Sequence, residues 1–457
     1  MRRVDFDREY SDGGRTAAAV IVALALLAVG LPTRSNAGGL SLLGFGGSTA
    51  GVAYAGAAAG VDDATTLFYN PAGLSKLKRT QFALSGDVIY FTAGPFQDTG
   101  SFDALGAPMT GGDGGDPKGG FVPSFALALV DDSSAVRLGF AVNAPFGQLT
   151  EYKESWVGRY FATKSELKTV KLNVSASVRL NDWASVGGGF NALRARFSLA
   201  NAIDFGSLCL GVAGPLCPTL GLRPQQSDGY GKISVSGWGY GYNLGFIFEP
   251  ADRTSIGIAY QSRVTVDVDG SAKFDVPGAA QILTQGSGLF RDTSAEANVT
   301  FPDSVVVGLR HELSTDWTVL AGLTWTNWSL LDELAVSFGN PAQPSATLPA
   351  DWQDAVYVSA GVVYRSTERL SLRAGIGYDQ SPIPDSTRSP RLPGSDAVTL
   401  TAGAGFKLND SVSLDLAIQY AIYDEARISL EEPGAGSLNG SFENNLLVSS
   451  LQLSMRF

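Results

Sequence analysis

Apolar and polar residues alternate along most of the chain from about residue 80 onward, with the two-residue period of a β-strand. In the segment 237–248, large apolar side chains occupy one face: Trp238, Tyr240, Tyr242, Leu244, Phe246 and Phe248. The opposite face carries Gly237, Gly239, Gly241, Asn243 and Gly245. The segment 171–180 likewise sets Leu172, Val174, Ala176, Val178 and Leu180 against Lys171, Asn173, Ser175, Ser177 and Arg179. The pattern predicts strands with one apolar face.

The connections between these strands indicate how the sheet is closed. The pattern predicts fourteen strands: 80–91, 121–130, 134–143, 168–180, 183–197, 232–248, 253–268, 298–311, 315–327, 352–366, 369–378, 396–407, 411–424 and 444–457. Tight turns such as Asn181-Asp182 alternate strictly with long loops at 92–120, 144–167, 198–231, 269–297, 328–351, 379–395 and 425–443. One strand alone would also fit a water-soluble β-sandwich. The alternation favours an all-β fold, a 14-stranded antiparallel transmembrane β-barrel with periplasmic turns and extracellular loops.

The first residues of the chain have the features of an export signal. Four arginines precede an apolar run over 17–31, which is too short for the ~20 residues that span a bilayer as a helix. The run is followed by Ser35-Asn36-Ala37, a small-residue cleavage pattern. We therefore predict a signal peptide over 1–37; a retained membrane anchor is the alternative.

Residues 38–79 do not alternate and are rich in glycine and alanine. A disordered exported tail would be more polar, so we expect this segment to be a plug folded into the lumen of a barrel over 80–457. Within it, Asn70 and Pro71 favour a turn. Asp62 and Asp63 could bind calcium, although adjacent carboxylates more often cap a short helix.

Composition narrows the classes of function. The chain has 457 residues, 55 of them glycine, and only 17% are charged. Its 33 basic and 44 acidic residues give a net charge of −11, which argues against a nucleic-acid partner. One histidine and two cysteines leave little for metal or histidine chemistry, so we expect no metal, no cofactor and no enzyme activity. Cys209 and Cys217 lie in one exported loop and are candidates for a disulfide, with free thiols as the alternative.

Several short motifs carry a resemblance to a known family. In the predicted plug they are Ala53-Tyr54-Ala55-Gly56, Asp62-Asp63-Ala64 and Asn70-Pro71-Ala72. Further along they are Ala144-Pro145-Phe146-Gly147, Trp156-Val157-Gly158-Arg159-Tyr160, the segment 237–243, Tyr260-Gln261-Ser262-Arg263, Trp325-Thr326-Asn327-Trp328 and the segment 377–384. In this order the chain resembles the outer-membrane long-chain fatty-acid transport proteins of FadL type, with their aromatic-hydrocarbon relatives. The resemblance implies passive transport of hydrophobic small molecules across the bacterial outer membrane.

The resemblance also implies where ligands would bind. The luminal site would use Gly38, Leu40 and Phe45, with Arg194 and Arg196 meeting a carboxylate; the alternative is that these arginines pair with luminal acids such as Asp204. Asn70, Pro71 and Ala72 would gate the plug. An external groove would be lined by Leu208, Leu210, Leu216, Leu220, Ile282, Leu283, Leu289 and Phe290. Without the resemblance, mutual packing of these loops would be favoured.

One departure from the family bears on the substrate. Its fatty-acid members carry a second basic residue shortly after the position of Trp328-Ser329, where this chain has the acidic stretch 330–335. Long-chain fatty acids remain our first expectation, with neutral or aromatic hydrocarbons as the alternative. A general polar porin and a surface adhesin are further alternatives. We also expect contact with outer-membrane lipid and lipopolysaccharide, a monomer, and a wall defect where the third strand meets Asn143-Ala144-Pro145.

Overall fold

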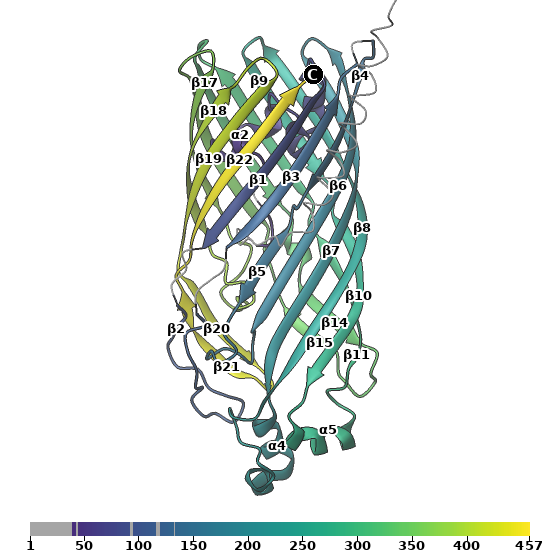
Figure 1. The fold of residues 1–457 in the computed structure, drawn as a ribbon, viewed down its shortest axis with the longest axis vertical. Helices are drawn as coiled ribbons and strands as arrows, with labels where there is room; N and C mark the ends of the chain where they lie inside the picture. Colours follow the sequence, from purple (N-terminus) through teal and green to yellow (C-terminus); the bar gives the residue numbers. More distant parts are fainter. Residues whose placement is uncertain (1–38, 43, 92–94, 116–118, 132) are drawn as a thin grey trace, which may run out of the picture.

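The fold is a closed antiparallel β-barrel (Figure 1). The structure, a computed structural model, describes residues 39–457 except 43, 92–94, 116–118 and 132, so the predicted signal peptide lies outside the described residues. β1 (Gln81–Phe91) pairs on one side with β3 (Gly120–Leu129) and on the other with β22 (Asn445–Arg456). Because the first strand of the sheet bonds to the last, no edge is left open along this seam.

The described residues make fourteen barrel spans, as predicted. Nine spans are single strands: β1, β3, β6 (Lys164–Asn181), β7 (Ala184–Asp204), β8 (Asp228–Ala251), β17 (Leu370–Asp379), β18 (Ala397–Lys407), β19 (Val412–Tyr423) and β22. Five spans are each divided in two: β4 (Val136–Asn143) with β5 (Gly147–Glu151), β9 (Thr254–Gln261) with β10 (Val264–Asp275), β11 (Thr293–Phe301) with β12 (Ser304–Glu312), β13 (Trp317–Thr326) with β14 (Glu333–Phe338), and β15 (Ala346–Pro349) with β16 (Ala355–Arg365). The short turns gather at one end of the barrel, the turn end, and the long loops at the other, the loop end (Figure 1).

The strands reach further toward the loop end than the sequence pattern predicted. β6, β7 and β8 extend well past their predicted ends, and β5, β14 and β15 lie in stretches assigned to loops. A separate three-stranded sheet at the loop end contains β2 (Gln97–Asp98), β20 (Ala426–Glu432) and β21 (Gly436–Phe442). These strands are held by backbone pairing outside the apolar belt, so they lack the apolar alternation from which strands were recognised.

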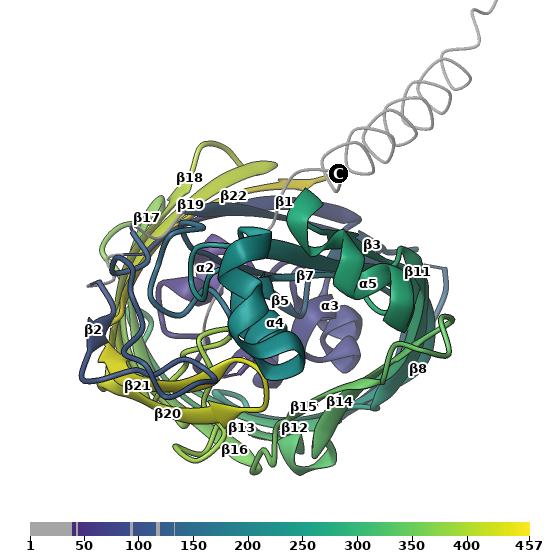
Figure 2. The ribbon, with the colours of Figure 1, turned by 90° about the horizontal axis from the view of Figure 1, so that it is seen from below.

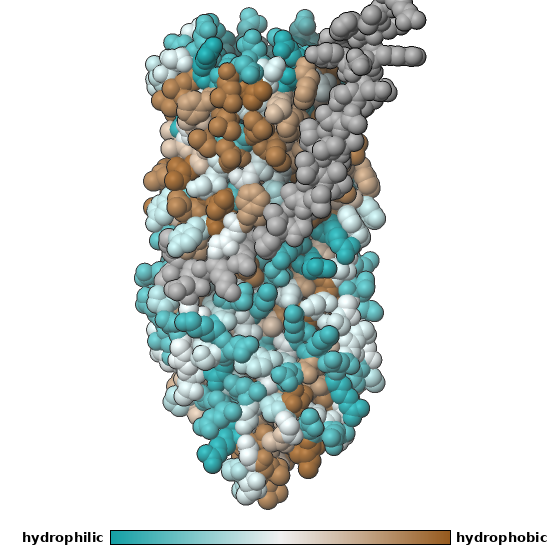
Figure 3. Space-filling model, in the orientation of Figure 1, coloured by the Kyte–Doolittle hydropathy of each residue, from teal (hydrophilic) through white to brown (hydrophobic). Residues whose placement is uncertain are grey.

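On the face shown in Figure 3, apolar side chains cover most of the half of the barrel nearest the turn end and form an apolar belt. On β8 its outward side chains run from Phe248 to Trp238, ten residue steps of ~3.3 Å that cover about 25 Å when the strand is tilted. That length matches the apolar band of an outer-membrane barrel. Toward the loop end the surface becomes mostly hydrophilic (Figure 3).

The N-terminal segment (residues 39–79) lies within the barrel, where the view along the axis shows α2 and α3 (Figure 2). It forms four short helices: α2 (Gly47–Ala50), η1 (Ala57–Ala59), α3 (Thr66–Tyr69) and η2 (Pro71–Lys76). Two contacts tie it to the wall at its acidic pair. Asp62 forms an ion pair with Arg310 at 3.0 Å, and Asp63 accepts a hydrogen bond from the Gln452 amide of β22 at 2.9 Å. Asp63 also accepts from the backbone N–H of Thr65 at 2.8 Å, two residues on, in the turn that precedes α3; the N-cap of α3 itself is Thr65, with no side-chain cap.

Inward-facing glycines of the wall allow the N-terminal segment to approach backbone to backbone. A Cβ added at Gly257 would lie 1.8 Å from the Ala58 carbonyl oxygen. A Cβ at Gly375 would lie 2.4 Å from the carbonyl carbon of Val52. Real Cβ contacts are never this short, so these glycines are required by the close approach.

The remaining helices belong to the loops. They are α4 (Phe205–Ala213), η3 (Gly214–Leu220), η4 (Gly278–Ala280), α5 (Gln281–Ser287) and η5 (Trp328–Leu330). Within the part of the chain that the structure describes, no helix combines the length and apolarity needed to cross a bilayer.

Candidate functional site

A cavity of about 170 Å³ lies between the N-terminal segment and the barrel wall. Its lining is rich in aromatic and aliphatic side chains: Leu42, Phe45, Tyr54, Phe68, Phe146, Leu193, Val264, Phe301 and Trp328. For comparison, an engineered apolar cavity of about 150 Å³ holds benzene. A second cavity of about 60 Å³ is lined by some of the same residues, including Leu42, Phe45 and Tyr54.

The lining of the cavity also includes polar side chains, among them hydroxyl and amide groups and two ionisable residues, Lys171 and Asp379. Among the described residues that line it, Lys171 of β6 is the basic one, and only 8% of this residue is exposed. Its Nζ donates a hydrogen bond to Oε1 of Gln261 at 3.1 Å. Asp379 also lines the cavity, as does Asn143. The sequence pattern had placed Lys171 on the face opposite the apolar side chains, yet that signal was not recognised as marking a ligand site.

The wall beside the cavity is interrupted where β4 ends at Asn143 and β5 begins at Gly147. The N-terminal segment bonds to this interruption: Leu42 N–H donates to the Pro145 carbonyl at 2.9 Å, and Gly147 N–H donates to the Leu40 carbonyl at 2.9 Å. Across the interruption, residues 120–124 of β3 have a ladder partner on β1 alone within the described part of the chain. The predicted wall defect thus coincides with a place where the barrel ladder is incomplete.

Phe146 lies at the centre of this interruption and points toward the cavity. Its ring stacks on Phe301 with centroids 4.6 Å apart and meets Trp328 edge-on at 6.0 Å. Its backbone is held by Thr169 of β6, whose Oγ1 accepts from the Phe146 N–H at 3.0 Å. The aromatic cluster therefore links the wall interruption to the cavity.

The predicted luminal residues divide into two groups. Phe45 lines both cavities, and Leu40 packs against the apolar cluster that contains Phe301, whereas Gly38 lies outside the described residues. The prediction for Arg194 and Arg196 was wrong, because both side chains point out of the barrel.

The burial pattern of β7 shows the reason for this error. Asn191 and Leu193 are buried and face inward, while Phe190, an even number of residues from both arginines, is 56% exposed on the outer face. The Arg194 guanidinium lies 5.5 Å from the centre of the outward Trp238 ring. Successive strand residues alternate between faces, so an arginine at 194 or 196 cannot share the face of Leu193.

The three predicted gating residues form a tight junction with the wall. Asn70 is fully buried, and its Nδ2 donates to the carbonyls of Ala58 at 2.7 Å and Phe246 at 3.1 Å. Its Oδ1 accepts from the Ala72 N–H at 3.0 Å, which caps η2, and Pro71 occupies the first position of that helix. The junction holds the N-terminal segment to β8.

The two loops predicted to form an external groove pack against each other. Phe205 of α4 meets Phe290 edge-on at 5.2 Å, and Leu208, Leu210 and Leu283 pack against the same cluster. Leu289 is half-buried, whereas the exposed members of the set are Leu216, Leu220 and Ile282. Mutual packing of the two loops therefore accounts for the buried and half-buried residues of the predicted groove but not for the three exposed ones. Cys209 and Cys217 form a disulfide within this cluster.

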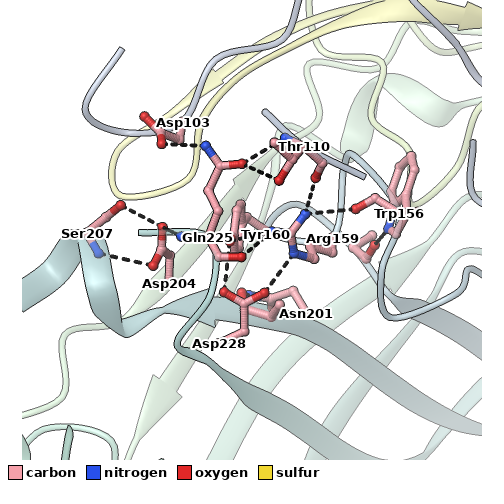
Figure 4. Close-up of polar contacts among 12 residues, drawn as sticks. Asp103, Thr110, Trp156, Arg159, Tyr160, Asn201, Asp204, Ser207, Gln225 and Asp228 are labelled. Atoms are coloured by element: carbon pink, nitrogen blue, oxygen red, sulfur yellow. Dashed lines mark hydrogen bonds and ion pairs between the residues drawn. The ribbon is translucent and has the colours of Figure 1, made fainter. Parts of the chain in front are cut away.

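A polar junction at the loop end joins three loops that are far apart in the sequence (Figure 4). Arg159, only 4% exposed, forms an ion pair with Asp228 at 2.8 Å and donates to the Thr110 carbonyl at 2.6 Å. Tyr160 donates to the other oxygen of Asp228 at 2.8 Å. The Gln225 amide adds a bond to Asp103 at 2.7 Å.

The charges of this junction support one another. Burial is the largest single effect and opposes the charge of Arg159, but the hydrogen bonds and electrostatic interactions with Asp228 and Tyr160 together outweigh it, so the pKa of the guanidinium lies above its usual value. Burial and the nearby carboxylates of Asp204 and Asp228 raise the pKa of the Tyr160 phenol. Arg159 therefore stays charged and Tyr160 stays a donor, which keeps the loops joined. Arg159 and Tyr160 belong to the motif Trp156-Val157-Gly158-Arg159-Tyr160, whose role in joining loops the sequence alone does not reveal.

Among the described residues, no group of histidine, cysteine and acidic side chains is arranged to hold a metal ion. The site is thus an apolar cavity with one buried amine, closed by an internal segment and placed next to a break in the wall.

Comparison with known proteins agrees with this architecture. A long-chain fatty acid transport protein of Escherichia coli O6:H1 is 27% identical over 443 residues, which cover 94% of this chain and 95% of that protein. Outer membrane protein P1 of Haemophilus influenzae is 28% identical over 409 residues, covering 84% and 86%. Among solved structures, a Pseudomonas aeruginosa FadL homologue superposes with a TM-score of 0.83 at 23% identity, covering 92% of this chain and all of the other. The Pseudomonas putida toluene transporter TodX superposes with a TM-score of 0.67 at 19% identity, covering 91% and 99%.

The two structural matches establish the fold, and the family comparison extends over almost the whole chain. The sequence pattern of the outer membrane protein transport protein family (OMPP1/FadL/TodX) matches residues 28–457. The chain belongs to this family of outer-membrane β-barrel transporters, and it is an outer-membrane protein.

Proposed function

We propose that this protein carries hydrophobic small molecules passively across the outer membrane, and that long-chain fatty acids are its main substrates. The observation that carries the proposal is the buried Lys171 amine in a cavity otherwise dominated by aromatic and aliphatic groups. A carboxylate on an apolar chain fits such a site, because its chain would contact the aromatic and aliphatic side chains while its carboxylate accepts a charge-assisted hydrogen bond from the Lys171 ammonium.

The path that we propose has three stages. The exposed Leu216, Leu220 and Ile282 at the loop end offer apolar contacts for first capture, in keeping with the groove that we predicted there. The cavity between the N-terminal segment and the wall is the second stage. The ligand then leaves sideways through the wall at the interruption between β4 and β5, once Leu40 and Leu42 release it. Junctions such as that of Asn70 control this release.

A second candidate substrate class is supported by the size of the cavity. At about 170 Å³ it is close to the cavity of about 150 Å³ that holds benzene, and below the ~300 Å³ of the smallest usual ligand pockets. A monoaromatic hydrocarbon would fit without rearrangement, whereas a long acyl chain requires the cavity to extend. The TodX and TbuX structures are described as toluene transporters, which is consistent with this second class in the same fold.

The two classes are separated by measuring binding of palmitate and of toluene to the purified full-length protein in detergent. We expect Lys171→Met to weaken palmitate binding by about 10- to 100-fold, the range for a lost hydrogen bond to a charged group, and to leave toluene binding unchanged. The matched control is Lys168→Met, three residues away on β6 with its side chain on the outer face.

Each outcome of this experiment bears on one statement. Unchanged palmitate binding in Lys171→Met would contradict the carboxylate role of Lys171. Binding of toluene without palmitate would assign the protein to hydrocarbons. Binding of neither ligand, together with a large ion conductance in planar bilayers, would contradict hydrophobic transport altogether and favour a polar porin.

A further inference from the structure

On the outer face of β6, β7 and β8, the apolar belt ends at one row of residues that lie side by side. In this row Val170 of β6 lies opposite Arg194 of β7, which lies opposite Trp238 of β8. Toward the turn end the outward residues are apolar, and they include Phe190 and Tyr240, whose rings stack with centroids 5.8 Å apart. Aromatic girdles of this kind mark the boundary between the membrane core and the headgroups.

Basic residues gather directly beyond this boundary, on the loop-end side. We call them the basic face: Lys164, Lys168, Arg194, Arg196 and Lys232. Within positions 164–170 of β6, 194–200 of β7 and 232–238 of β8, Glu166 is the one acid on the outward face, so the five basic residues and Glu166 carry a net charge of +4. The whole chain, in contrast, carries −11. On the neighbouring strand β10, Asp269 lies opposite Ser236 and marks the edge of the basic face.

Like charges lie directly opposite each other on this face. Lys168 is the cross-strand partner of Arg196, and Lys232 is the partner of Lys273 on β10. Such pairs destabilise a sheet unless an anion lies between them. Glu166 supplies a negative charge for only some of these residues, since it contacts Lys168 at 2.7 Å and Lys164 at 3.8 Å. Arg196 is exposed and has no hydrogen-bond or ion-pair partner among the residues that the structure describes.

We propose that the basic face binds the phosphorylated headgroup of lipopolysaccharide in the outer leaflet. The face spans β6, β7 and β8, two strand spacings or about 10 Å, and about 13 Å along β6 from Lys164 to Lys168. That area accommodates more than one phosphate. Arginine guanidinium groups bind phosphate oxygens in pairs, and Arg194 is oriented by the Trp238 ring and by a hydrogen bond to Ser236 at 3.3 Å.

The test compares lipopolysaccharide binding to the full-length protein in detergent by native mass spectrometry and by titration. The test variant is Lys168→Gln/Arg194→Gln/Arg196→Gln, whose three side chains all lie on the outer face of the barrel. Each basic residue near an anionic lipid surface contributes about fivefold, so we expect about 100-fold weaker binding of lipopolysaccharide. Lipopolysaccharide from which the phosphates have been removed should bind the unaltered protein equally weakly.

The control variant removes the same charge at the loop end but outside the face: Arg223→Gln/Arg291→Gln/Arg427→Gln. We expect it to bind lipopolysaccharide as the unaltered protein does, and palmitate binding should be unchanged in both variants. The charge-conserving variant Lys168→Arg/Arg194→Lys/Arg196→Lys should keep most of the affinity. Equal binding by the test variant, equal loss in the control, or undiminished binding of the dephosphorylated glycolipid would each overturn the proposal.

Discussion

The contact between Asn70 and the barrel wall predicts how firmly the N-terminal segment is docked. The perturbation is Asn70→Leu, which keeps the branching and nearly the volume of the side chain but removes its donor and its acceptor. In the structure, Nδ2 donates to the Ala58 carbonyl at 2.7 Å, and Oδ1 accepts from the Ala72 N–H at 3.0 Å. Both backbone groups lie in the buried interior, so both lose their partners.

The magnitude follows from these two orphaned groups. A buried donor or acceptor without a partner costs about 1–3 kcal/mol. Two of them therefore destabilise docking by at least about 2 kcal/mol, which is about a 30-fold change in the docking equilibrium. The bond from Nδ2 to the Phe246 carbonyl at 3.1 Å adds to this. The barrel ladder itself does not involve the Asn70 side chain, so its stability should change little.

Amide hydrogen exchange of the full-length protein in detergent measures this effect directly. We expect protection over residues 57–76 to fall by about 30-fold or more, while amides in the β18–β19 ladder keep their protection. The matched control is Asn298→Leu, which removes an exposed outward asparagine whose bond is to Asp267. The reasoning is refuted if protection over 57–76 stays within about threefold of the unaltered protein, or if the control loses as much.

Two further predictions concern other contacts. Gly257→Ala places a Cβ 1.8 Å from the Ala58 carbonyl oxygen, so the N-terminal segment must shift; we expect a loss of at least about 1–3 kcal/mol, the usual cost of overpacking, measured as a lower melting temperature. Arg159→Met removes the ion-pair partner of the half-buried Asp228 at the loop junction; we expect a local loss of about 1.5–3 kcal/mol, the usual contribution of a hydrogen bond to a charged group, measured as faster amide exchange in residues 156–163 and 225–228.

Matched controls are available for both. Gly211→Ala adds a Cβ where no atom lies within 4 Å, and it should leave the melting temperature unchanged. Lys153→Met removes an exposed charge in the loop that also carries Arg159, and it should leave exchange unchanged. A melting temperature in Gly257→Ala equal to that of the control would contradict the close-approach argument. Exchange in Arg159→Met that matches the control would show that the junction does not hold the loops together.

The barrel could be predicted from the sequence because the bilayer imposes a simple rule on its wall. Outward side chains within the belt must be apolar, and the segment 238–248 displays this rule with six large side chains at every second position. Beyond the belt the outer face meets water and the rule no longer applies. The loop-end extensions of β6, β7 and β8, and the small sheet of β20 and β21, therefore left no periodic signal.

The site was only partly predictable, and the error at the arginines has a definite cause. Arg194 and Arg196 were assigned to the luminal site from their position near the end of a strand. Counting every second residue from the outward-facing Phe190 places both of them on the outer face. The same count would have selected Lys171, which shares the inward face of Asn173 and Ser175. The cavity itself depends on contacts between Leu40–Leu42 and residues 145–147, more than a hundred positions away, which no local pattern encodes.

The pairing of β1 with β22 has a consequence for the order of assembly. The chain segment that lies within the barrel precedes all the barrel strands in the sequence, and Gln452 on β22, the final strand of the barrel, donates a hydrogen bond to the Asp63 carboxylate of this segment. When β22 pairs with β1, it therefore closes the barrel and at the same time completes the surface that binds the N-terminal segment. A chain truncated before β22 would lack both. In the full chain, the apolar N-terminal segment stays exposed until β22 has been made. Assembly of this barrel therefore depends on keeping residues 39–79 from aggregating during export.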